Sequence, residues 1–391
     1  YGAYASVWPL WIERLGAPVT IVGLMLGIGG YLRLFVLAPA AAIADRFGYR
    51  RVIVFARIVS VIGFLGAAVS NHWPQLVLVI IAFAIGEMVF PLVQTIVAVE
   101  AGDARMRSFA LVFNVGPSIA LAISPLIGAG VVALFGMRAA FVLGALFSAV
   151  AVLFFARLTN PEVETSADQT SASSYRAAIR EPSVRLVGTL LLLTVFSLSF
   201  GVAFIPTFLE DVRGFEPSGI TALAALPALG SAAFGLIVAR NKRLQQVPLI
   251  ATAIPVGAMS LGFLMIRETA FLPLLMLAFF LRGGLFSAWA TLISALGELA
   301  PARLRTRSFA LLEMAGGVAF ASGPMVAGLM YARRETLPFE IAIVLVIGLV
   351  PLFVIAQRLA DRMPKTGSSN GGANRMEPVN TEPPGASKPA T

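Results

Sequence analysis

The sequence contains no cysteine and only one histidine, His72, among its 391 residues. The absence of cysteine excludes disulfide scaffolds, thiolate metal sites and cysteine nucleophiles, and a lone histidine excludes a metal site built from a histidine cluster. Charge is scarce as well, because 13% of the residues are charged, against about 25% in an ordinary soluble domain. A soluble fold of this size would lack enough polar surface to cover itself, so this class is excluded.

Apolar residues make up 58% of the chain, and the mean hydropathy is +0.88. A helix needs about 20 apolar residues to cross the hydrocarbon core of a membrane. Runs of this kind recur without the alternation of a β-barrel, which predicts an all-α polytopic membrane protein with twelve helices. The first helix would cover about 22 Å of a core of about 30 Å, so we expect it to be truncated at its N-terminus. The expected spans are 1–15, 17–44, 51–70, 74–99, 108–132, 138–157, 186–209, 217–239, 247–266, 270–297, 308–332 and 338–359.

The net charge of +9 is scattered in short clusters between the apolar runs. This distribution lacks the basic face of a nucleic-acid binder, so we expect no nucleic-acid partner and a lipid bilayer instead. Of the 29 lysine and arginine residues, 20 fall in the loops and terminal segment of one side, six in the opposite loops and three inside spans. The positive-inside rule places the first side in the cytoplasm, and the even helix count places both termini there. We expect the protein in the plasma membrane.

The longest polar break is residues 159–183, which are rich in Ser, Thr, Ala and acidic residues. This composition predicts a solvated linker between two six-helix bundles, residues 1–158 and 184–363. Residues 364–391 hold Pro, Gly, Ser and Asn with few apolar residues, so a disordered tail is expected there.

An internal repeat relates the two halves. The pentapeptide Arg-Ser-Phe-Ala-Leu at 107–111 recurs at 307–311, 200 residues later. Helix 5 thus corresponds to helix 11, and because six helices separate the partners, the halves have the same orientation in the membrane. The sequence therefore predicts parallel repeats related by an axis along the membrane normal. Further matching pairs are Gly116 with Gly316, Gly128 with Gly328, Pro9 with Pro206, and Glu13 with Glu210.

The loop between predicted helices 2 and 3 carries a motif, Ala-Ala-Ile-Ala-Asp-Arg-Phe-Gly-Tyr-Arg-Arg at 41–51. It resembles the Gly-x-Leu-Ala-Asp-Arg-x-Gly-Arg-Arg signature of the major facilitator superfamily, which lies at this position. Ala41 replaces the first glycine, and Tyr49 replaces the arginine after the second. The positions that the resemblance assigns to a cytoplasmic gate are Asp45, Arg46, Gly48, Arg50 and Arg51.

Asp45 lies at a helix end, where an acid can accept hydrogen bonds from the N-terminus of another helix. In the architecture that the resemblance implies, that neighbour is helix 11, near Arg307. Asp45 would then bridge the two halves when the cytoplasmic side is shut. The alternative is a solvated carboxylate that helps to fix the geometry of its own loop.

Ionisable residues inside the spans are candidates for function, because an unpaired charge in hydrocarbon is costly. Arg33, Glu87 and Arg282 fall mid-span on helices 2, 4 and 10, and Glu313 lies nearer the cytoplasmic end of helix 11. Arg33 and Glu87 have similar depth, about 18 Å from the cytoplasmic ends, so they can pair. The pair is either a static packing element or a substrate or proton site. Arg57, on peripheral helix 3, is interpreted as structural.

Three further residues complete the predicted pathway. Asn114 on helix 5 can bind substrate or bridge helices. Phe286 and Trp289 follow Arg282 at i+4 and i+7, so all three are expected to share one face of helix 10. An arginine beside aromatic rings suits an amphipathic organic solute, whereas the alternative is a pair of lipid-facing rings.

The resemblance implies a secondary transporter, acting as a monomer, in which two bundles rock about a central cavity lined by helices 1, 4, 7 and 10. No phosphate-binding loop, kinase signature or nucleophile elbow occurs, so we expect neither an enzyme nor a cofactor. Glu87 and Glu313 suit protons as the coupling ion, and Gly116-Pro117 is a partial form of an exporter motif. We therefore expect proton-coupled efflux of a small amphipathic organic solute.

Other functions stay open from the sequence. An uptake carrier for a sugar, an organic anion or another metabolite would have the same architecture. A non-transporting receptor would not need titratable groups in the cavity. A lipid flippase would need an open lateral path between the halves.

Overall fold

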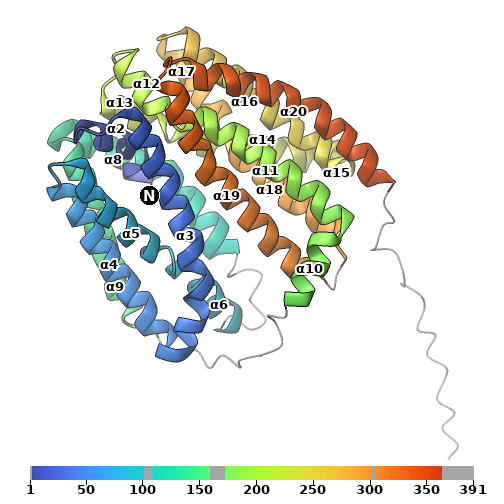
Figure 1. Ribbon diagram of the computed structural model, residues 1–391, viewed down its shortest axis with the longest axis horizontal. Helices are drawn as coiled ribbons and strands as arrows, with labels where there is room; N and C mark the ends of the chain where they lie inside the picture. The colour runs from blue at the N-terminus through green and yellow to red at the C-terminus, as the bar shows by residue number, and fades with distance from the viewer. Residues whose placement is uncertain (1, 101–107, 109, 159–171, 302–303, 363–391) are drawn as a thin grey trace, which may run out of the picture.

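The computed structural model describes residues 2–100, 108, 110–158, 172–301 and 304–362 (Figure 1). Within these ranges the chain is helical and contains no strand. Eleven segments of the described chain are long and apolar enough to cross a membrane. Together with the short first helix they give the predicted twelve. The predicted tail, 364–391, lies outside the described residues.

The first half contains six predicted helices, two of which are interrupted. The first helix is divided into α1 and α2, and the fourth into α5 and α6, while the fifth begins with a π-helical turn at Ala110–Val115. The elements are α1 (Gly2–Ala5), α2 (Val7–Arg14), α3 (Val19–Phe47), α4 (Tyr49–Val69), α5 (Leu76–Gly86), α6 (Val89–Glu100), α8 (Gly116–Phe135) and α9 (Met137–Phe155).

The second half repeats this arrangement, with interruptions in its first, second and fourth helices. A short helix, α10 (Ala172–Arg180), lies inside the range expected as a linker. The other elements are α11 (Pro182–Val202), α12 (Ile205–Asp211), α13 (Pro217–Leu223), α14 (Leu226–Arg240), α15 (Lys242–Gln246), α16 (Pro248–Glu268), α17 (Leu272–Leu281), α18 (Gly284–Leu299), α19 (Arg305–Tyr331) and α20 (Leu337–Asp361).

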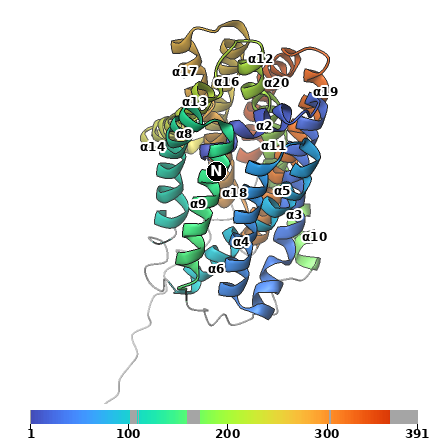
Figure 2. The same ribbon diagram turned by 90° about the vertical axis from the view of Figure 1, so that its left-hand side faces the viewer.

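The two halves lie side by side, the first in blue and teal and the second in green to red, and they meet along α3 and α19 (Figure 1). In Figures 1 and 2 the junction of α3 with α4, and also α10, lie at the bottom, and α12 and α17 lie at the top. We call the bottom the linker end and the top the far end. Helices α3 and α19 separate toward the linker end (Figure 1).

Prolines explain most of the interruptions. A proline ring clashes with the carbonyl group four residues earlier and removes one helical hydrogen bond. Helices α1, α11 and α13 each end four residues before a proline, and helix 4 breaks at the same distance. The positions where these helices break are Ala5, Glu87, Val202 and Leu223, which precede Pro9, Pro91, Pro206 and Pro227 by four residues.

The turns that follow helices 1 and 7 confirm the predicted repeat. Gly16 and Gly214 occupy equivalent places in the two halves and both have positive φ, 88° and 69°. A residue with a side chain is strained at such φ angles, so glycine is required for the chain to reverse direction there. The two halves therefore turn in the same way at the far end, as parallel repeats should.

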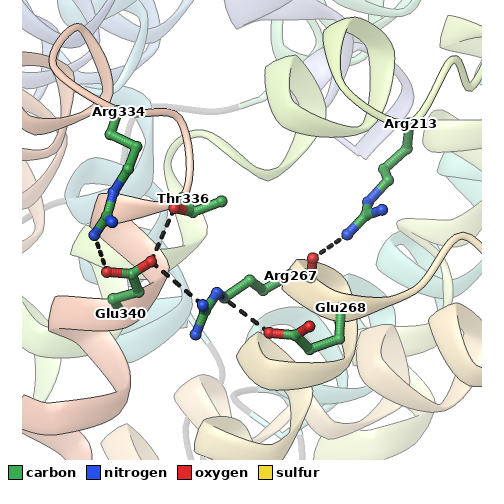
Figure 3. Close-up of polar contacts among 6 residues, drawn as sticks. All are labelled: Arg213, Arg267, Glu268, Arg334, Thr336 and Glu340. Carbon is green, nitrogen blue, oxygen red and sulfur yellow. Dashed lines mark hydrogen bonds and ion pairs between the residues drawn. The ribbon is translucent and has the colours of Figure 1, made fainter.

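The far end of the second half is stabilised by a polar network around Glu340, in the first turn of α20 (Figure 3). Glu340 pairs with Arg334, lies 3.5 Å from Arg267 and accepts a 2.9 Å hydrogen bond from Thr336. Arg213 in turn donates to the carbonyl oxygen of Arg267. Three separate loops are thereby joined through Arg213, Arg267 and Arg334.

We expect Glu340→Gln to lower the free energy of unfolding by about 1–2 kcal/mol, because Arg334 loses its charged partner and Arg267 loses one of its two. Thermal unfolding in detergent measures this change. Glu268→Gln is the matched control, since Glu268 is 58% exposed and lies 3.3 Å from Arg267. The control should change stability by less than about 0.5 kcal/mol. Equal losses in the two variants would contradict the central role of Glu340.

Candidate functional site

A cavity of about 690 Å³ lies between the halves and is the candidate functional site. It is lined by helices 1, 2, 4 and 5 of the first half and by helices 7, 8, 10 and 11 of the second. The lining is mostly apolar and includes six aromatic residues, and three charged residues reach it. These residues are Arg33, Glu87 and Arg282.

Arg33 and Glu87 form the ion pair that their similar depth allowed. The Nε atom of Arg33 lies 3.5 Å from Oε2 of Glu87, and the two side chains are 49% and 45% exposed. Glu87 directly follows α5, where Pro91 interrupts helix 4, so its side chain starts from a break in the helix. Both groups line the cavity and remain accessible, which differs from a pair buried between packed helices.

Arg282 occupies the corresponding break on the opposite side of the cavity. It directly follows α17, and the Gly283-Gly284 pair separates it from the second part of helix 10. Its guanidinium carbon lies 4.5 Å from the centre of the Phe279 ring, and its Nε is buried without a hydrogen-bond partner. Within the described part of the chain no carboxylate lies within ion-pair distance of it. Arg282 is thus a cation at the cavity wall that a ligand can neutralise.

The expectation that Arg282, Phe286 and Trp289 share one face is met only in part. Phe286 lines the cavity, but Trp289 does not belong to its lining. The indole nitrogen of Trp289 instead donates a 3.2 Å hydrogen bond to Oε1 of Glu313 on α19. The prediction assumed a continuous helix 10, and the break at Gly283 changes the register that it used.

Glu313 lies apart from the cavity, closer to the linker end. One helical turn further along α19, Gly317 packs against Leu34 of α3, so this face of α19 points to the other half. Glu313 itself is exposed. The side chain of Asn114 is outside what the structure describes, although its neighbour Phe113 lines the cavity.

The motif between helices 2 and 3 forms contacts within its own half. Asp45 accepts a 2.9 Å hydrogen bond from the hydroxyl group of Tyr49, the residue that departs from the family signature. Arg46 lies 5.3 Å from the Phe47 ring, and Gly48 has a φ of 90° that allows α3 to pass directly into α4. The predicted bridge from Asp45 to helix 11 belongs to a state closed at the linker end and stays a prediction.

Two other motif residues, Arg50 and Arg51, are exposed in the first turn of α4. Arg57 lies deeper on the same helix, with its guanidinium carbon 5.9 Å from the centre of the Phe155 ring. Its Nε is buried without a hydrogen bond. Arg57 does not reach the cavity, in agreement with its interpretation as a structural residue.

The far end of the cavity is closed by close packing that was not predicted from the sequence. A methyl group added at Gly23 would lie 2.5 Å from the carbonyl oxygen of Pro324, and one at Gly27 would lie 2.5 Å from that of Ala321. Only glycine lets α3 and α19 approach so closely. The spacing of Gly23, Gly27 and Gly30 along one face of α3 was the signal in the sequence.

Two polar contacts also join the halves. Arg14 at the end of helix 1 forms a 2.7 Å ion pair with Glu210 at the end of helix 7, and Tyr31 shares a 2.6 Å hydrogen bond with Ser322. Arg14 is 55% exposed, so its ion pair contributes little more than about 1 kcal/mol. The glycine contact and these polar contacts together close the far end.

Comparison with known proteins agrees with this architecture. The sequence profile of the Major Facilitator Superfamily matches residues 1–324. An uncharacterized MFS-type transporter of Mycobacterium tuberculosis (strain ATCC 25618 / H37Rv) is 25% identical over 168 residues, which are 42% of this chain and 40% of that protein. The chain therefore spans about two fifths of the length of this curated relative.

Solved structures share the fold at low identity. A bacterial homologue of the human lysosomal transporter Spinster, in an inward-facing and unoccupied conformation, superposes with a TM-score of 0.72 at 16% identity and covers 93% of this chain and 95% of its own. The nucleoside transporter NupG superposes with a TM-score of 0.73 at 17% identity and covers 93% and 96%. The profile match, the parallel six-helix repeats and the motif at 41–51 agree: this chain belongs to the major facilitator superfamily.

Proposed function

We propose that this protein is a secondary transporter that exports an amphipathic organic anion by alternating access, with protons as the coupling ion. The observation that carries the choice of an anion is Arg282, a cavity-lining cation without a carboxylate partner among the described residues. With Glu87 paired to Arg33, the charged lining of the cavity is positive by one unit. A carboxylate, sulfonate or phosphate group would neutralise it.

The rest of the cavity suits an apolar body. Tyr4, Trp8, Phe83, Phe286 and Phe320 line it from both halves. Ligand sites of this kind combine apolar and aromatic walls with a few convergent polar groups that fix orientation. An amphipathic solute would place its anionic group at Arg282 and its apolar part against these rings.

Proton coupling is assigned to Glu87. Its carboxylate is accessible from the cavity and lies 3.5 Å from Arg33 in its own half, while Arg282 lies on the half that moves against it. Rocking of the halves would change the electrostatic influence of Arg282 on Glu87 but leave that of Arg33 almost unchanged. A carboxylate in such a position can bind a proton in one state and release it in the other.

Flux measurements in proteoliposomes test this function directly. A series of solutes with the same aromatic body and an anionic, neutral or cationic group should be offered with and without a pH gradient. We expect gradient-driven transport of the anionic solute and at least about tenfold less of the cationic one, a difference of about 1.4 kcal/mol. Preference for the cation would overturn the assignment of Arg282, and binding without flux would favour a receptor.

The orientation is part of the same proposal, with the linker end facing the cytoplasm. Because the chain has no cysteine, single cysteines can be placed at Arg46, Arg176 and Arg243 on the linker end and at Phe271 on the far end. An impermeant thiol reagent outside intact cells should label the residue at 271 and spare the other three. Labelling at 176 from outside would contradict the orientation.

A further inference from the structure

A second cavity of about 510 Å³ lies outside the central one, between α3 and α5. Its lining comes from Ile21–Phe35 of α3, from Val77–Ile81 of α5 and from Trp73, and we call it the side groove. The lining is apolar almost throughout. Its one hydroxyl group belongs to Tyr31 and is already bonded to Ser322 at 2.6 Å.

The side groove faces the hydrocarbon of the bilayer. Both of its helices are membrane-spanning segments, and groove residues Ile28 and Ile81 are 39% and 41% exposed on the outside of the bundle. The lining of α3 extends over about 21 Å, at 1.5 Å per residue, which is roughly two thirds of the hydrocarbon core. The groove thus runs along the helices, parallel to the chains of the surrounding lipids.

The side groove shares a wall with the central cavity. Met25 and Ile80 line both cavities and are only 5% and 4% exposed, so in this state they separate them. Methionine is unbranched and has three rotatable bonds, so it can change conformation at little cost. Arg33, which reaches the central cavity, is two turns from Met25 on the same helix.

We propose that the side groove binds the alkyl tail of an amphipathic substrate that enters from the bilayer, while the anionic group of that substrate occupies the central cavity. This inference rests on the proposed function and names the class of substrate, a single-chain alkyl anion. A linear chain matches the length, direction and apolar lining of the groove. The wall of Met25 and Ile80 is where the chain passes from one cavity to the other.

The groove determines which tails are accepted more than how tightly they bind. An alkyl chain that moves from lipid into an apolar groove exchanges one apolar surrounding for another and gains little free energy. The anionic group in the central cavity supplies most of the affinity. Filling the groove should therefore impair long-tailed substrates and spare short-tailed ones with the same anionic group.

The test uses dodecyl sulfonate and butyl sulfonate as substrates in proteoliposomes, with Ile28→Trp to fill the groove. We expect the variant to raise KM for dodecyl sulfonate at least about tenfold, which equals about 1.4 kcal/mol, and to leave butyl sulfonate unchanged. Ile62→Trp on α4 is the control, because Ile62 is 61% exposed and lies outside the groove. Equal KM changes for both sulfonates, or none for dodecyl sulfonate, would overturn the proposal.

Photolabelling separates this proposal from the proposed function. A dodecyl sulfonate with a diazirine at the end of its chain should label residues 21–35 and 77–81, and Ile28→Trp should remove this labelling. If neither sulfonate is transported but the groove is labelled, the proposed function fails and the tail site stands. If a diazirine phospholipid labels the groove and dodecyl sulfonate does not compete, the occupant is a bilayer lipid and the proposal is wrong.

Discussion

Glu87→Gln should abolish transport driven by a pH gradient and leave exchange of substrate between the two sides measurable. Glutamine has nearly the same shape as a protonated glutamate but can neither bind nor release a proton. Exchange needs only the substrate-loaded halves to rock, and this step requires no proton release. Gradient-driven flux and counterflow in the same proteoliposomes measure the two quantities.

The competing interpretation of Glu87 is a static pair with Arg33. In that case Glu87→Gln would leave Arg33 without its partner and lower stability, and the double change with Arg33→Met would restore it. The structure limits the loss, because the two side chains are 49% and 45% exposed and water can solvate Arg33. We therefore expect little change in thermal stability. A stable Glu87→Gln protein that is fully active under a pH gradient would exclude Glu87 as the coupling residue.

Arg282→Met should raise KM for the anionic substrate about 10- to 150-fold, since a hydrogen bond to a charged group contributes about 1.5–3 kcal/mol. Arg282→Lys keeps the charge but loses the planar geometry, so its effect should be smaller. Transport kinetics of the anionic and neutral members of one solute series measure the change. The neutral solute should be affected little by Arg282→Met.

Thermal stability distinguishes a binding role of Arg282 from a structural one. Its Nε is buried without a hydrogen bond, so methionine removes a desolvation cost and should leave the unfolding midpoint equal or higher. If instead the contact with Phe279 at 4.5 Å holds helix 10 in place, its loss would cost about 0.5–2 kcal/mol. A lower midpoint with unchanged KM for the anion would contradict the binding role.

The architecture could be predicted from the sequence because hydrophobic runs and a repeated pentapeptide are local signals. The similar depth of Arg33 and Glu87, which allows them to pair, could be predicted for a similar reason, since helix rise alone fixes it. The interruptions were missed, although a proline four residues after most of them, and the Gly283-Gly284 pair in helix 10, were visible in the sequence. Consequently Trp289, expected beside Arg282 on an unbroken helix, lies against Glu313 instead.

Contacts between the halves were harder to predict. Glu13 and Glu210 were identified as equivalent in the repeat, which places both near the far end. In the structure the neighbour of Glu13, Arg14, forms the ion pair with Glu210. This contact depends on how the two halves pack against each other, and no local sequence pattern specifies that packing. The approach of Gly27 to Ala321 also depends on how two distant helices pack.

The most direct test of alternating access is a distance measurement between spin labels on the two halves. One pair, Phe135→Cys with Phe271→Cys, reports on the far end, and another, Phe47→Cys with Arg243→Cys, reports on the linker end. These residues are exposed, and the chain has no native cysteine. The two distances are measured in the protein that keeps Gly27 and in the Gly27→Leu variant. The leucine side chain does not fit the contact between α3 and α19.

Gly235→Leu is the control, because a methyl group added at this position of α14 meets no atom of another segment within 4 Å. We predict that Gly27→Leu lengthens the far-end distance and shortens the linker-end distance, while Gly235→Leu changes neither. If Gly27→Leu leaves both distances unchanged, or moves them in the same direction, the halves do not rock about the central cavity.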